Sequence, residues 1–140
     1  MPRFLCFTVA DLALAIHLDQ VAEVAPLPQI TRIPRPGRHI EGLVSLRGRP
    51  IPVVDLRKRL GLVNPATGGT ARMIVALPGG RDEPLGLIVD AVGEILSVGE
   101  AERPRRVPAP WVDQGFLLGA LEVQGRQVLL PDLEKLADLA

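Results

Sequence analysis

Residues 40–55 read IEGLVSLRGRPIPVVD and carry the clearest folding signal in the chain. From residue 40 to residue 46, every second position (Ile, Gly, Val, Leu) belongs to one face, which is the period of a β-strand packed against a core on one side. Arg47-Gly48-Arg49 provides a turn, and Ile51–Val54 predicts the returning strand. The stretch therefore predicts a β-hairpin.

Helices are predicted at two places. Asp55 is a suitable N-cap for a short helix over Leu56–Leu60, and Gly61 suits the position that follows a helix end. After Pro131-Asp132, the C-terminus has the pattern of a second short amphipathic helix. Its inward positions are Leu133, Leu136 and Leu139.

The same alternation, interrupted by turn residues, recurs along the whole chain. The other predicted strands are residues 4–9, 12–18, 21–24, 71–77, 85–92, 94–98, 116–123 and 127–130. About nine or ten short strands with two short helices are typical of an all-β barrel or sandwich. Two proline-rich connections, residues 26–37 and 99–110, favour two small barrels packed together over one large barrel. No internal repeat is strong enough to indicate duplication.

Length and composition agree with this picture. The chain has 140 residues, of which 47% are hydrophobic and 23% charged, as in a globular rather than a disordered protein. This length predicts one domain, or two small subdomains that share a core. No apolar run approaches the roughly 18 residues that span a bilayer, and no basic segment precedes an apolar one at the N-terminus. We expect a cytoplasmic protein with no direct membrane insertion.

The formal net charge is zero, but the charges are unevenly distributed. Residues 32–59 contain eight bases and two acids, a balance of 8 − 2 = +6, whereas residues 82–102 contain six acids and no base. Such a dipolar chain suits docking between proteins, although an uneven solvated surface explains it equally well. A small nucleic-acid-binding barrel using residues 32–59 is an alternative. The acidic stretch and an aromatic content of only 3% count against it, so no nucleic acid partner is expected.

Residues 85–96 are apolar on both faces of the predicted strands, broken mainly by Gly86, Asp90, Gly93 and Glu94. A strand that is apolar on both faces needs a cover on each side. One cover would be the other barrel. The second is either the rest of the protein or a partner, and the residues leave both open.

Side chains that could support catalysis or bind a metal are few and scattered. His17 and His39, the only two histidines, lie on different predicted elements without metal-ligand spacing. Cys6 lies in a predicted strand with nothing nearby in sequence to lower its pKa, which favours a structural thiol over a nucleophile. Ser45 lacks the G-x-S-x-G context of a hydrolase. We expect no metal and no cofactor.

Asp90 and Glu94 are the carboxylates that acid–base chemistry would have to use. They flank a predicted β-bulge at Gly93 within an acidic stretch, which favours a solvated edge over a catalytic pair. Neither Gly68-Gly69 nor Gly79-Gly80 has the sequence of a phosphate-binding loop. The sequence therefore does not predict an enzyme.

Four ordered blocks of sequence resemble the CheW-like domain family. They read QITRIP (residues 29–34), IEGLVSLRG (residues 40–48), IPVVDLR (residues 51–57) and GLIVDAVGEIL (residues 86–96). The last block matches the family's GlxVDxVxxIL stretch. The likeness runs from about Phe4 to the closing DLEKL segment, which is nearly the whole chain.

The resemblance implies that residues 1–140 form a single CheW-like domain, with two five-stranded SH3-like β-barrel subdomains packed on a common hydrophobic core. It also implies a non-catalytic adaptor that couples transmembrane chemoreceptors to a CheA-type histidine kinase. The implied partners are the regulatory domain of the kinase and the cytoplasmic tip of a methyl-accepting chemoreceptor, within receptor arrays. A divergent scaffold in a pathway other than flagellar chemotaxis is the alternative that the resemblance leaves open.

The resemblance further implies partner-binding roles in three segments: the hairpin around the turn arginine, the segment after the first hairpin, and the edge of the groove between the barrels. The residues are Arg47 and Gly42 in the first segment, Val21, Glu23 and Val24 in the second, and Val92 and Ile95 in the third. Two positions depart from the family pattern. Ser45 stands where the family usually has Asn, and Pro131 interrupts a usually aliphatic strand end.

Overall fold

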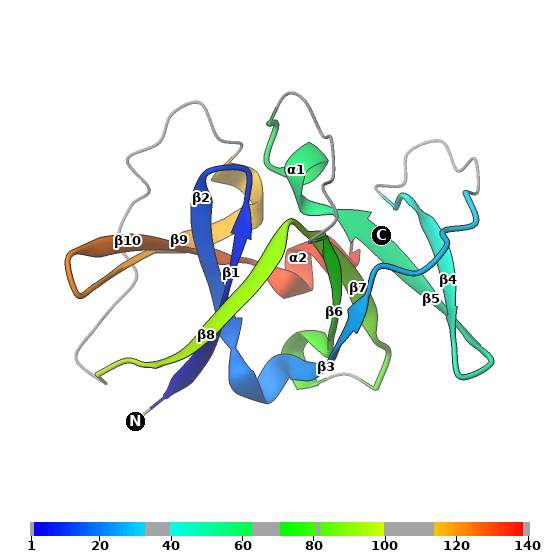
Figure 1. The fold of residues 1–140 in the computed structure, drawn as a ribbon, viewed down its shortest axis with the longest axis horizontal. Coiled ribbons are helices and arrows are strands. Elements are labelled where there is room, and N and C mark those ends of the chain that lie inside the picture. Colours follow the sequence, from blue (N-terminus) through cyan, green and yellow to red (C-terminus); the bar gives the residue numbers. More distant parts are fainter. Residues whose placement is uncertain (1, 33–39, 63–70, 81, 100–113, 139–140) are drawn as a thin grey trace.

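A computed structural model describes residues 2–32, 40–62, 71–80, 82–99 and 114–138 (Figure 1). Within this part of the chain, ten β-strands and two short α-helices alternate with short 3-10 turns. The strands are β1 (Arg3–Val9), β2 (Leu12–His17), β3 (Val21–Pro26), β4 (Gly42–Leu46), β5 (Arg49–Asp55), β6 (Arg72–Ala76), β7 (Leu85–Val89), β8 (Ala91–Ser97), β9 (Leu117–Val123) and β10 (Arg126–Pro131). The helices are α1 (Leu56–Arg59) and α2 (Leu133–Asp138), and the 3-10 turns are η1 (Leu18–Gln20), η2 (Pro78–Gly80) and η3 (Gln114–Phe116).

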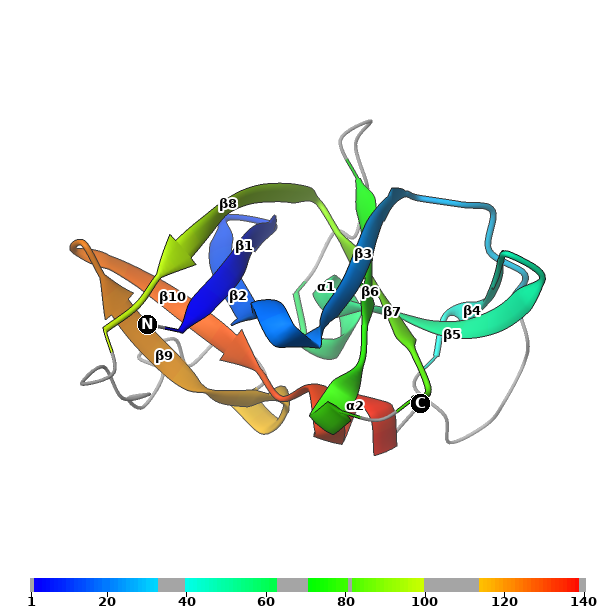
Figure 2. The same ribbon diagram turned by 90° about the horizontal axis from the view of Figure 1, so that it is seen from below.

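The strands form two five-stranded sheets, each curled into a small barrel. Barrel A has the strand order β8-β1-β2-β10-β9, and barrel B has the order β3-β6-β7-β5-β4. The only parallel neighbours among the described strands are β2 with β10 and β5 with β7. The prediction of an all-β fold with two five-stranded SH3-like subdomains is confirmed. Figures 1 and 2 show the barrels side by side, with α1 and α2 between them.

Three hydrophobic cores among the described residues hold this arrangement together. A common core lies between the barrels, and each barrel also encloses a smaller core of its own. The common core takes residues from both sheets, among them Phe7, Leu14, Ile74, Leu87 and Leu129. The cores therefore confirm the predicted packing of two barrels over shared apolar side chains.

The strand alternation explains why so many strands are apolar on both faces. In β6, Ile74 and Ala76 face the common core while Met73 and Val75 face the core of barrel B. One face of each central strand packs into the core of its own barrel, and the other face packs into the common core. Burial on both faces removes the polar alternation expected of a sheet with one solvated side.

The apolar run of residues 85–96, predicted as strands 85–92 and 94–98, is divided differently in the structure. β7 is buried at all five positions, so the rest of the protein supplies both of its covers. The chain then leaves barrel B at Asp90 and enters barrel A as β8, which is mostly exposed. The prediction of one strand over residues 85–92 is wrong, because the chain crosses from barrel B to barrel A at Asp90 within that range. The predicted bulge at Gly93 is confirmed. Val92 pairs with Phe7 and Ile95 with Leu5, so β8 has one more residue than β1 between the same two pairs.

Element boundaries otherwise differ by a few residues. Residue 18 is predicted within a strand, but Leu18 starts η1, and β4 begins at Gly42 rather than at residue 40. The N-cap at Asp55 is confirmed, since its side chain accepts a hydrogen bond from the N–H of Arg57. Leu133 and Leu136 of α2 are buried as predicted, whereas Leu139 lies outside the described residues.

The structure reveals an internal repeat that the sequence analysis missed. Residues 3–59 contain β1-β2-β3-β4-β5-α1 in this order, and residues 72–138 contain β6-β7-β8-β9-β10-α2. The corresponding strands pair in the same way, including one parallel pair in each barrel. Both third strands, β3 and β8, carry a register shift typical of a β-bulge. The two halves are therefore topological copies of each other.

Once the strands are matched, the repeat is visible in the sequence. Residues 21–24 read VAEV and residues 92–95 read VGEI. Residues 40–60 align with residues 117–137 without a gap, and the identical pairs are Gly42/Gly119, Gly48/Gly125, Arg49/Arg126, Asp55/Asp132, Leu56/Leu133 and Lys58/Lys135. The hairpin turns share left-handed backbone angles, with φ 52° at both Arg47 and Gln124 and φ 78° and 77° at the glycines that follow. Both turns have the positive φ angles of the type I′ turn that suits a two-residue hairpin.

Neither half forms a barrel by itself. Barrel A combines β1 and β2 of the first half with β8, β9 and β10 of the second, and barrel B does the reverse. The halves are thus interlocked by strand exchange across the common core.

This interlocking predicts that the two barrels unfold together. Replacing Leu87, which is fully buried in the common core, with Ala should lower the free energy of unfolding by about 2–5 kcal/mol. We expect a single urea transition in far-UV circular dichroism, with its midpoint lowered and its m-value unchanged. Leu118→Ala is the control, since this side chain is 63% exposed and its loss should cost no more than about 0.5 kcal/mol. Separate transitions for the two barrels would contradict the prediction.

Candidate partner-binding face

The residues implied in partner binding lie on edge strands and the hairpins beside them. Val21, Glu23 and Val24 are on β3, the edge of barrel B, whereas Val92 and Ile95 are on β8, the edge of barrel A. Figures 1 and 2 show β3 and β8 on the same side of the molecule, toward the viewer in Figure 1 and along the upper side in Figure 2. The fold therefore brings together two segments that are about half the chain apart.

Four of these side chains form the rim of the common core. By register, Val21 and Val24 lie opposite Ala76 and Ile74 of that core. Val92 and Ile95 lie opposite Phe7 and Leu5 of the same core. We call Val21, Val24, Val92 and Ile95 the inter-barrel face.

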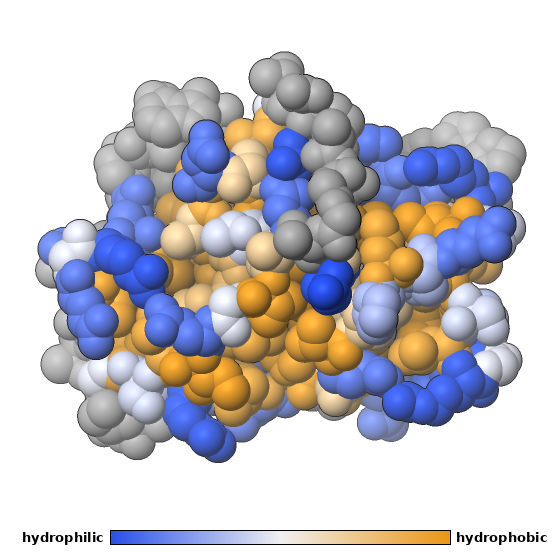
Figure 3. Space-filling model, in the orientation of Figure 1, coloured by the Kyte–Doolittle hydropathy of each residue, from blue (hydrophilic) through white to orange (hydrophobic). Residues whose placement is uncertain are grey.

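The outer part of the inter-barrel face is exposed. Val21 and Val92 are half-buried against the common core, whereas Val24 is 40% and Ile95 51% exposed. Figure 3 shows apolar side chains gathered across the middle of this side of the molecule, with polar side chains around them. An apolar patch with a polar rim is typical of a surface that binds another protein.

Arg47 and Glu23 form a bidentate ion pair. The guanidinium Nη1 lies 2.6 Å from one carboxylate oxygen of Glu23, and Nη2 lies 3.1 Å from the other. The Arg47 side chain is 76% exposed, and that of Glu23 27%. Two of the residues that the family resemblance singled out are thus in direct contact. The remaining exposure of Arg47 leaves it accessible to a partner.

The Arg47–Glu23 pair links the two edge strands of barrel B. Glu23 lies on β3, at one end of the strand order, and Arg47 lies in the turn that follows β4, at the other end. A backbone bridge also joins Thr31, in the segment after β3, to Leu43 of β4. Together these contacts close the open side of the barrel.

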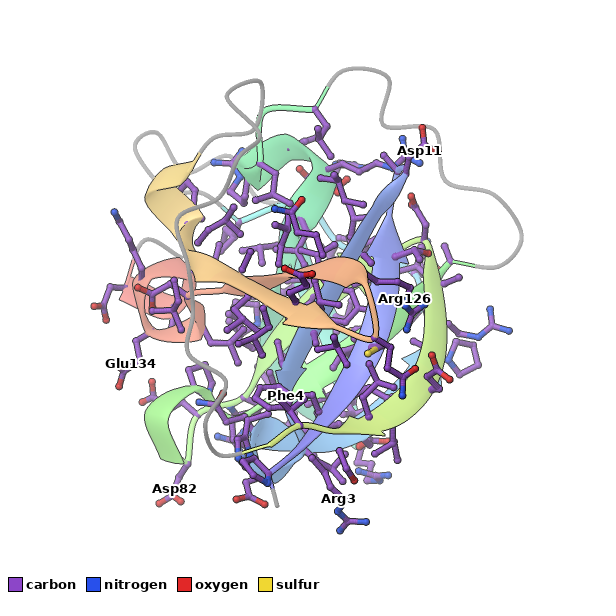
Figure 4. All side chains as sticks on the ribbon, turned by 90° about the vertical axis from the view of Figure 1, so that its left-hand side faces the viewer. Arg3, Phe4, Asp11, Asp82, Arg126 and Glu134 are labelled. Carbon is purple, nitrogen blue, oxygen red and sulfur yellow. The ribbon has the colours of Figure 1, made fainter. Side chains whose placement is uncertain are left out.

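Barrel A carries a similar pair that the sequence analysis did not assign, although its arginine corresponds to Arg49 rather than to Arg47. Arg126, just after the β9–β10 turn, lies 3.0 Å from Glu94 on β8. Figure 4 shows Arg126 at the tip of its hairpin, on the side of β8. The signal that could have found this pair is the match of VGEI to VAEV together with the shared Gly-Arg after both turns.

Gly42 is buried, and the structure gives its position a steric reason. A Cβ atom built there would lie 2.2 Å from the carbonyl oxygen of Thr31 and 2.8 Å from Cγ2 of Ile30. Only glycine lets the segment after β3 approach β4 this closely. Gly42 therefore shapes the barrel edge rather than presenting a side chain to a partner.

Asp90 and Glu94 do not form an acid–base pair. The carboxylate of Asp90 accepts hydrogen bonds from Arg57 on α1, at 2.6 and 3.0 Å, and from the backbone N–H of Ala10. Glu94 instead pairs with Arg126. Asp90 thus joins barrel A, through the β1–β2 turn, to the helix that follows barrel B.

The other candidate side chains have structural surroundings. Burial, followed by the charge of Glu94, raises the pKa of the Cys6 thiol, which disfavours the reactive thiolate. His17 packs edge to face against Phe4 and accepts a hydrogen bond from the N–H of Asp19. No group of three His, Cys, Asp or Glu side chains in the described part of the chain is placed to hold a metal ion. His39 lies outside the described residues. None of the described helices is long and apolar enough to cross a membrane.

Several basic side chains in the described part of residues 32–59 have partners within the protein. Arg32 and Lys58 both contact Glu41, at 2.6 and 2.7 Å, and Arg57 contacts Asp90. Arg49 donates to the backbone carbonyl of Asp82. These contacts occupy cations that a nucleic-acid-binding surface would direct at phosphates.

The chain is therefore an interlocked double barrel that exposes an apolar patch with polar side chains around it. The family model described as the CheW-like domain matches residues 3–140, so the chain belongs to the CheW-like domain family. The chain is 29% identical to the chemotaxis protein CheW of Rhizobium meliloti over 94% of its length and 84% of the relative's. It is 32% identical to the chemotaxis protein CheW of Klebsiella aerogenes over 96% of its length and 80% of the relative's.

A solved structure supports the same assignment. The crystal structure of the scaffolding protein TtCheW from Thermoanaerobacter tengcongensis superposes with a TM-score of 0.81. It is 32% identical in sequence and covers 94% of this chain and 89% of the other. The family and the fold predicted from the sequence are thus confirmed.

Glu41 should make stability depend on pH. Burial alone would raise its pKa, but hydrogen bonds from Lys58 and Arg32, together with their charges, bring it below the ordinary glutamate value. A lowered pKa in the folded state gives stability that is present above the unfolded-state pKa and is lost as the pH falls through the folded one. We expect Glu41→Gln to lower the free energy of unfolding at pH 7 and to weaken its decline between roughly pH 5 and pH 3. Urea titrations across this range measure both effects.

Asp55→Asn is the matched control, because burial raises the pKa of Asp55. A raised folded-state pKa adds stability on acidification, so removing the carboxylate should steepen the acid decline rather than weaken it. Equal changes in both variants would contradict the assignment of Glu41.

Proposed function

We propose that this chain is a non-catalytic adaptor that couples chemoreceptors to a CheA-type histidine kinase in chemosensory signalling. The observation that carries the proposal is the inter-barrel face, an exposed apolar patch formed by the edge strands of both barrels. Membership of the CheW-like family supports it, since the relatives reported above are named chemotaxis proteins and the solved structure is named a scaffolding protein. The chain uses neither metal nor cofactor in this role.

The seven implied residues divide into two kinds in this proposal. Val21, Val24, Val92 and Ile95 contact a partner through apolar surface, and Arg47 adds an exposed charge beside them. Glu23 holds the Arg47 guanidinium, and Gly42 shapes the edge of the barrel on which Arg47 sits.

The proposed partners are the cytoplasmic tip of a methyl-accepting chemoreceptor and the regulatory domain of the kinase. Binding to them would recruit the chain, as a single domain of residues 1–140, from the cytoplasm to receptor arrays. A client in a pathway other than flagellar chemotaxis is the second candidate, and it uses the same surfaces.

The decisive measurement is calorimetry of the chain with the regulatory domain of each CheA-type kinase in its own organism. Binding in the micromolar range or tighter supports the proposal, and the absence of binding to all of them leaves the second candidate.

Arg47→Ala should weaken partner binding without unfolding the protein. Loss of an interfacial arginine typically lowers affinity by roughly ten- to a hundredfold. Because the Arg47–Glu23 pair is exposed, its loss should change the free energy of unfolding by no more than about 1 kcal/mol. Calorimetry with the kinase domain and with a receptor-tip fragment measures the first effect, and urea titration the second. Arg3→Ala, at an exposed position on β1, is the control. A variant that loses binding only because it unfolds would show that Arg47 is structural.

Ile95→Asp should also abolish most binding of the receptor tip. The substitution places a charge in an apolar contact, and we expect at least a tenfold loss of affinity. Leu118→Asp is the matched control, because Leu118 is as exposed and apolar but lies on β9, outside the inter-barrel face. Equal losses in the two variants would show that the inter-barrel face has no special role.

A further inference from the structure

Asp90 belongs to a junction between the two halves of the chain. It lies between β7 and β8, and its N–H donates to the carbonyl of Thr8 on β1, at 2.9 Å. Its carboxylate accepts hydrogen bonds from the N–H of Ala10 in the β1–β2 turn and from the guanidinium of Arg57 on α1. The side chains of Asp90 and Arg57 are only 18% and 16% exposed. We call Asp90, Thr8, Ala10 and Arg57 the closed junction, because together they fix the start of β8 to the first half.

The internal repeat places a second copy of this junction before β3. Residues 16–24 read IHLDQVAEV and residues 87–95 read LIVDAVGEI, so Asp19 corresponds to Asp90. Residues 40–60 align with residues 117–137, so Glu134 on α2 corresponds to Arg57 on α1. The cation of the closed junction is therefore replaced by an acid in the second copy.

The strand register identifies the backbone groups of the second copy. β1 and β6 pair with equivalent residues of β8 and β3, which gives an offset of 74 − 5 = 69 residues between them. The pairs that fix this offset are Ile95/Leu5 and Val24/Ile74. Thr8 thus corresponds to Leu77, and Ala10 corresponds to Gly79. The left-handed φ angles of Ala10 and Gly79, 54° and 59°, agree with this match. We call Asp19, Leu77, Gly79 and Glu134 the open junction.

The contacts of Asp19 differ from those of Asp90. The N–H of Asp19 donates to Nδ1 of His17, two residues before it, at 3.2 Å. The side chain of Asp19 is 89% exposed. A backbone hydrogen bond from Leu77 to the carbonyl of Gln20, at 2.8 Å, joins η1 to the end of β6. The start of β3 is therefore held to the second half by fewer contacts than the start of β8 is held to the first.

Glu134 explains this difference. α2 packs on η2, and a Cβ atom built at Gly79 would lie 2.2 Å from Oε1 of Glu134, so the carboxylate lies directly against the turn. At the closed junction, the carboxylate against the equivalent turn is that of Asp90. Two carboxylates do not share one site without a cation, because like charges repel. Glu134 therefore occupies the place that Asp19 would take, and Asp19 stays in solvent.

The two junctions lie at opposite ends of the molecule. α1 and the β1–β2 turn are toward the top of Figure 1, whereas η1 and η2 are at the bottom. η1 contains no buried residue, so it can leave η2 without exposing the interior of the common core. A segment with little buried surface and few backbone hydrogen bonds opens at a lower free energy than the core around it. Opening at the bottom therefore leaves the closed junction intact.

We infer that the two barrels are held by one closed and one open junction, so that the start of β3 moves while the start of β8 is fixed. η1 detaches from η2 in native-state fluctuations, and the Arg57–Asp90 pair keeps the other junction together. This motion is a property of the free chain and needs no partner. One edge strand is thus a rigid reference and the equivalent edge strand is movable.

Native-state hydrogen exchange of the full chain, followed by NMR, measures both junctions at once. The reporters are the N–H groups of Asp90 and Leu77, because their hydrogen bonds to Thr8 and Gln20 join the halves at the two junctions. The N–H of Leu87, in the common core, reports global unfolding and corrects for changes in overall stability. After correction for intrinsic exchange rates, we expect Leu77 to be at least about tenfold less protected than Asp90.

Glu134→Arg transplants the cation of the closed junction into the open one. The new arginine should pair with Asp19 and raise the protection of Leu77, relative to Leu87, by about fivefold, as an ion pair worth about 1 kcal/mol would. Glu134→Gln is the matched control, because it removes the repulsion without supplying a cation, and it should produce a smaller rise. In the double variant Glu134→Arg/Asp19→Asn, the additional rise should disappear.

Arg57→Gln is the converse change. It leaves the partly buried carboxylate of Asp90 without this arginine, so the protection of Asp90 should fall at least about tenfold relative to Leu87. The protection of Leu77 relative to Leu87 should stay unchanged. If Arg57→Gln does not fold, the wild-type comparison and the Glu134 variants decide the inference by themselves.

Equal protection of Leu77 and Asp90 in the wild-type chain would overturn the inference. A rise in Glu134→Arg that persists after Asp19 is replaced would also overturn it, because the transplanted arginine would then act without the proposed partner. Neither result bears on the proposed function, since both are measured on the free chain. Failure of the chain to bind a kinase domain would likewise leave the difference between the junctions unaffected.

Discussion

The structure depends on one constraint: neither half of the chain can close a barrel without strands from the other. Each half supplies two strands to one barrel and three to the other, and the side chains between the barrels form the common core. The central strands are therefore buried on both faces, β7 most completely. Removing apolar surface from water on both sides of a sheet is the main favourable contribution to stability in so small a chain. The same exchange fixes the position of one barrel relative to the other. Asp90, where the chain crosses between the barrels, also binds Arg57 and the β1–β2 turn.

Strand exchange also determines where apolar surface remains exposed. The first strands after the chain crosses from one barrel to the other, β3 and β8, are edges of the two barrels and lie on the same side of the molecule. Edge strands leave side chains at the rim of the core incompletely covered, which is why Val24 and Ile95 remain exposed while their neighbours on β6 and β1 are buried. The two Glu–Arg pairs close the open sides of the barrels next to this rim. The exposed apolar surface is thus a direct result of the topology.

Much of the fold could be predicted from local pattern, because alternation, turn glycines and the N-cap at Asp55 are encoded within a few residues. The crossing at Asp90 could not, since β7 and β8 follow each other without a turn and both are apolar in sequence. The two strands differ in burial, because the rest of the protein covers both faces of β7 but only one face of β8. The repeat was missed because its sequence identity is confined to turns, caps and the VAEV/VGEI segment, whereas core positions conserve only apolar character. At the site, the family resemblance supplied Arg47 and Glu23 as separate residues. Only the three-dimensional structure shows that they form a pair and that Arg126 and Glu94 form a similar one.

A duplicated fold gives an adaptor two copies of one surface, and a function that distinguishes its partners requires differences between them. The core cannot provide such differences, because both barrels must pack on the same shared side chains. The hairpin turns can, since Arg47 and Gln124 are both exposed at the surface. Arg47 and Gln124 occupy that position in the two halves and differ by a full charge. Charges at an interface contribute more to orientation and specificity than to affinity, so an exposed turn is a position at which the two halves can differ without disturbing the shared core.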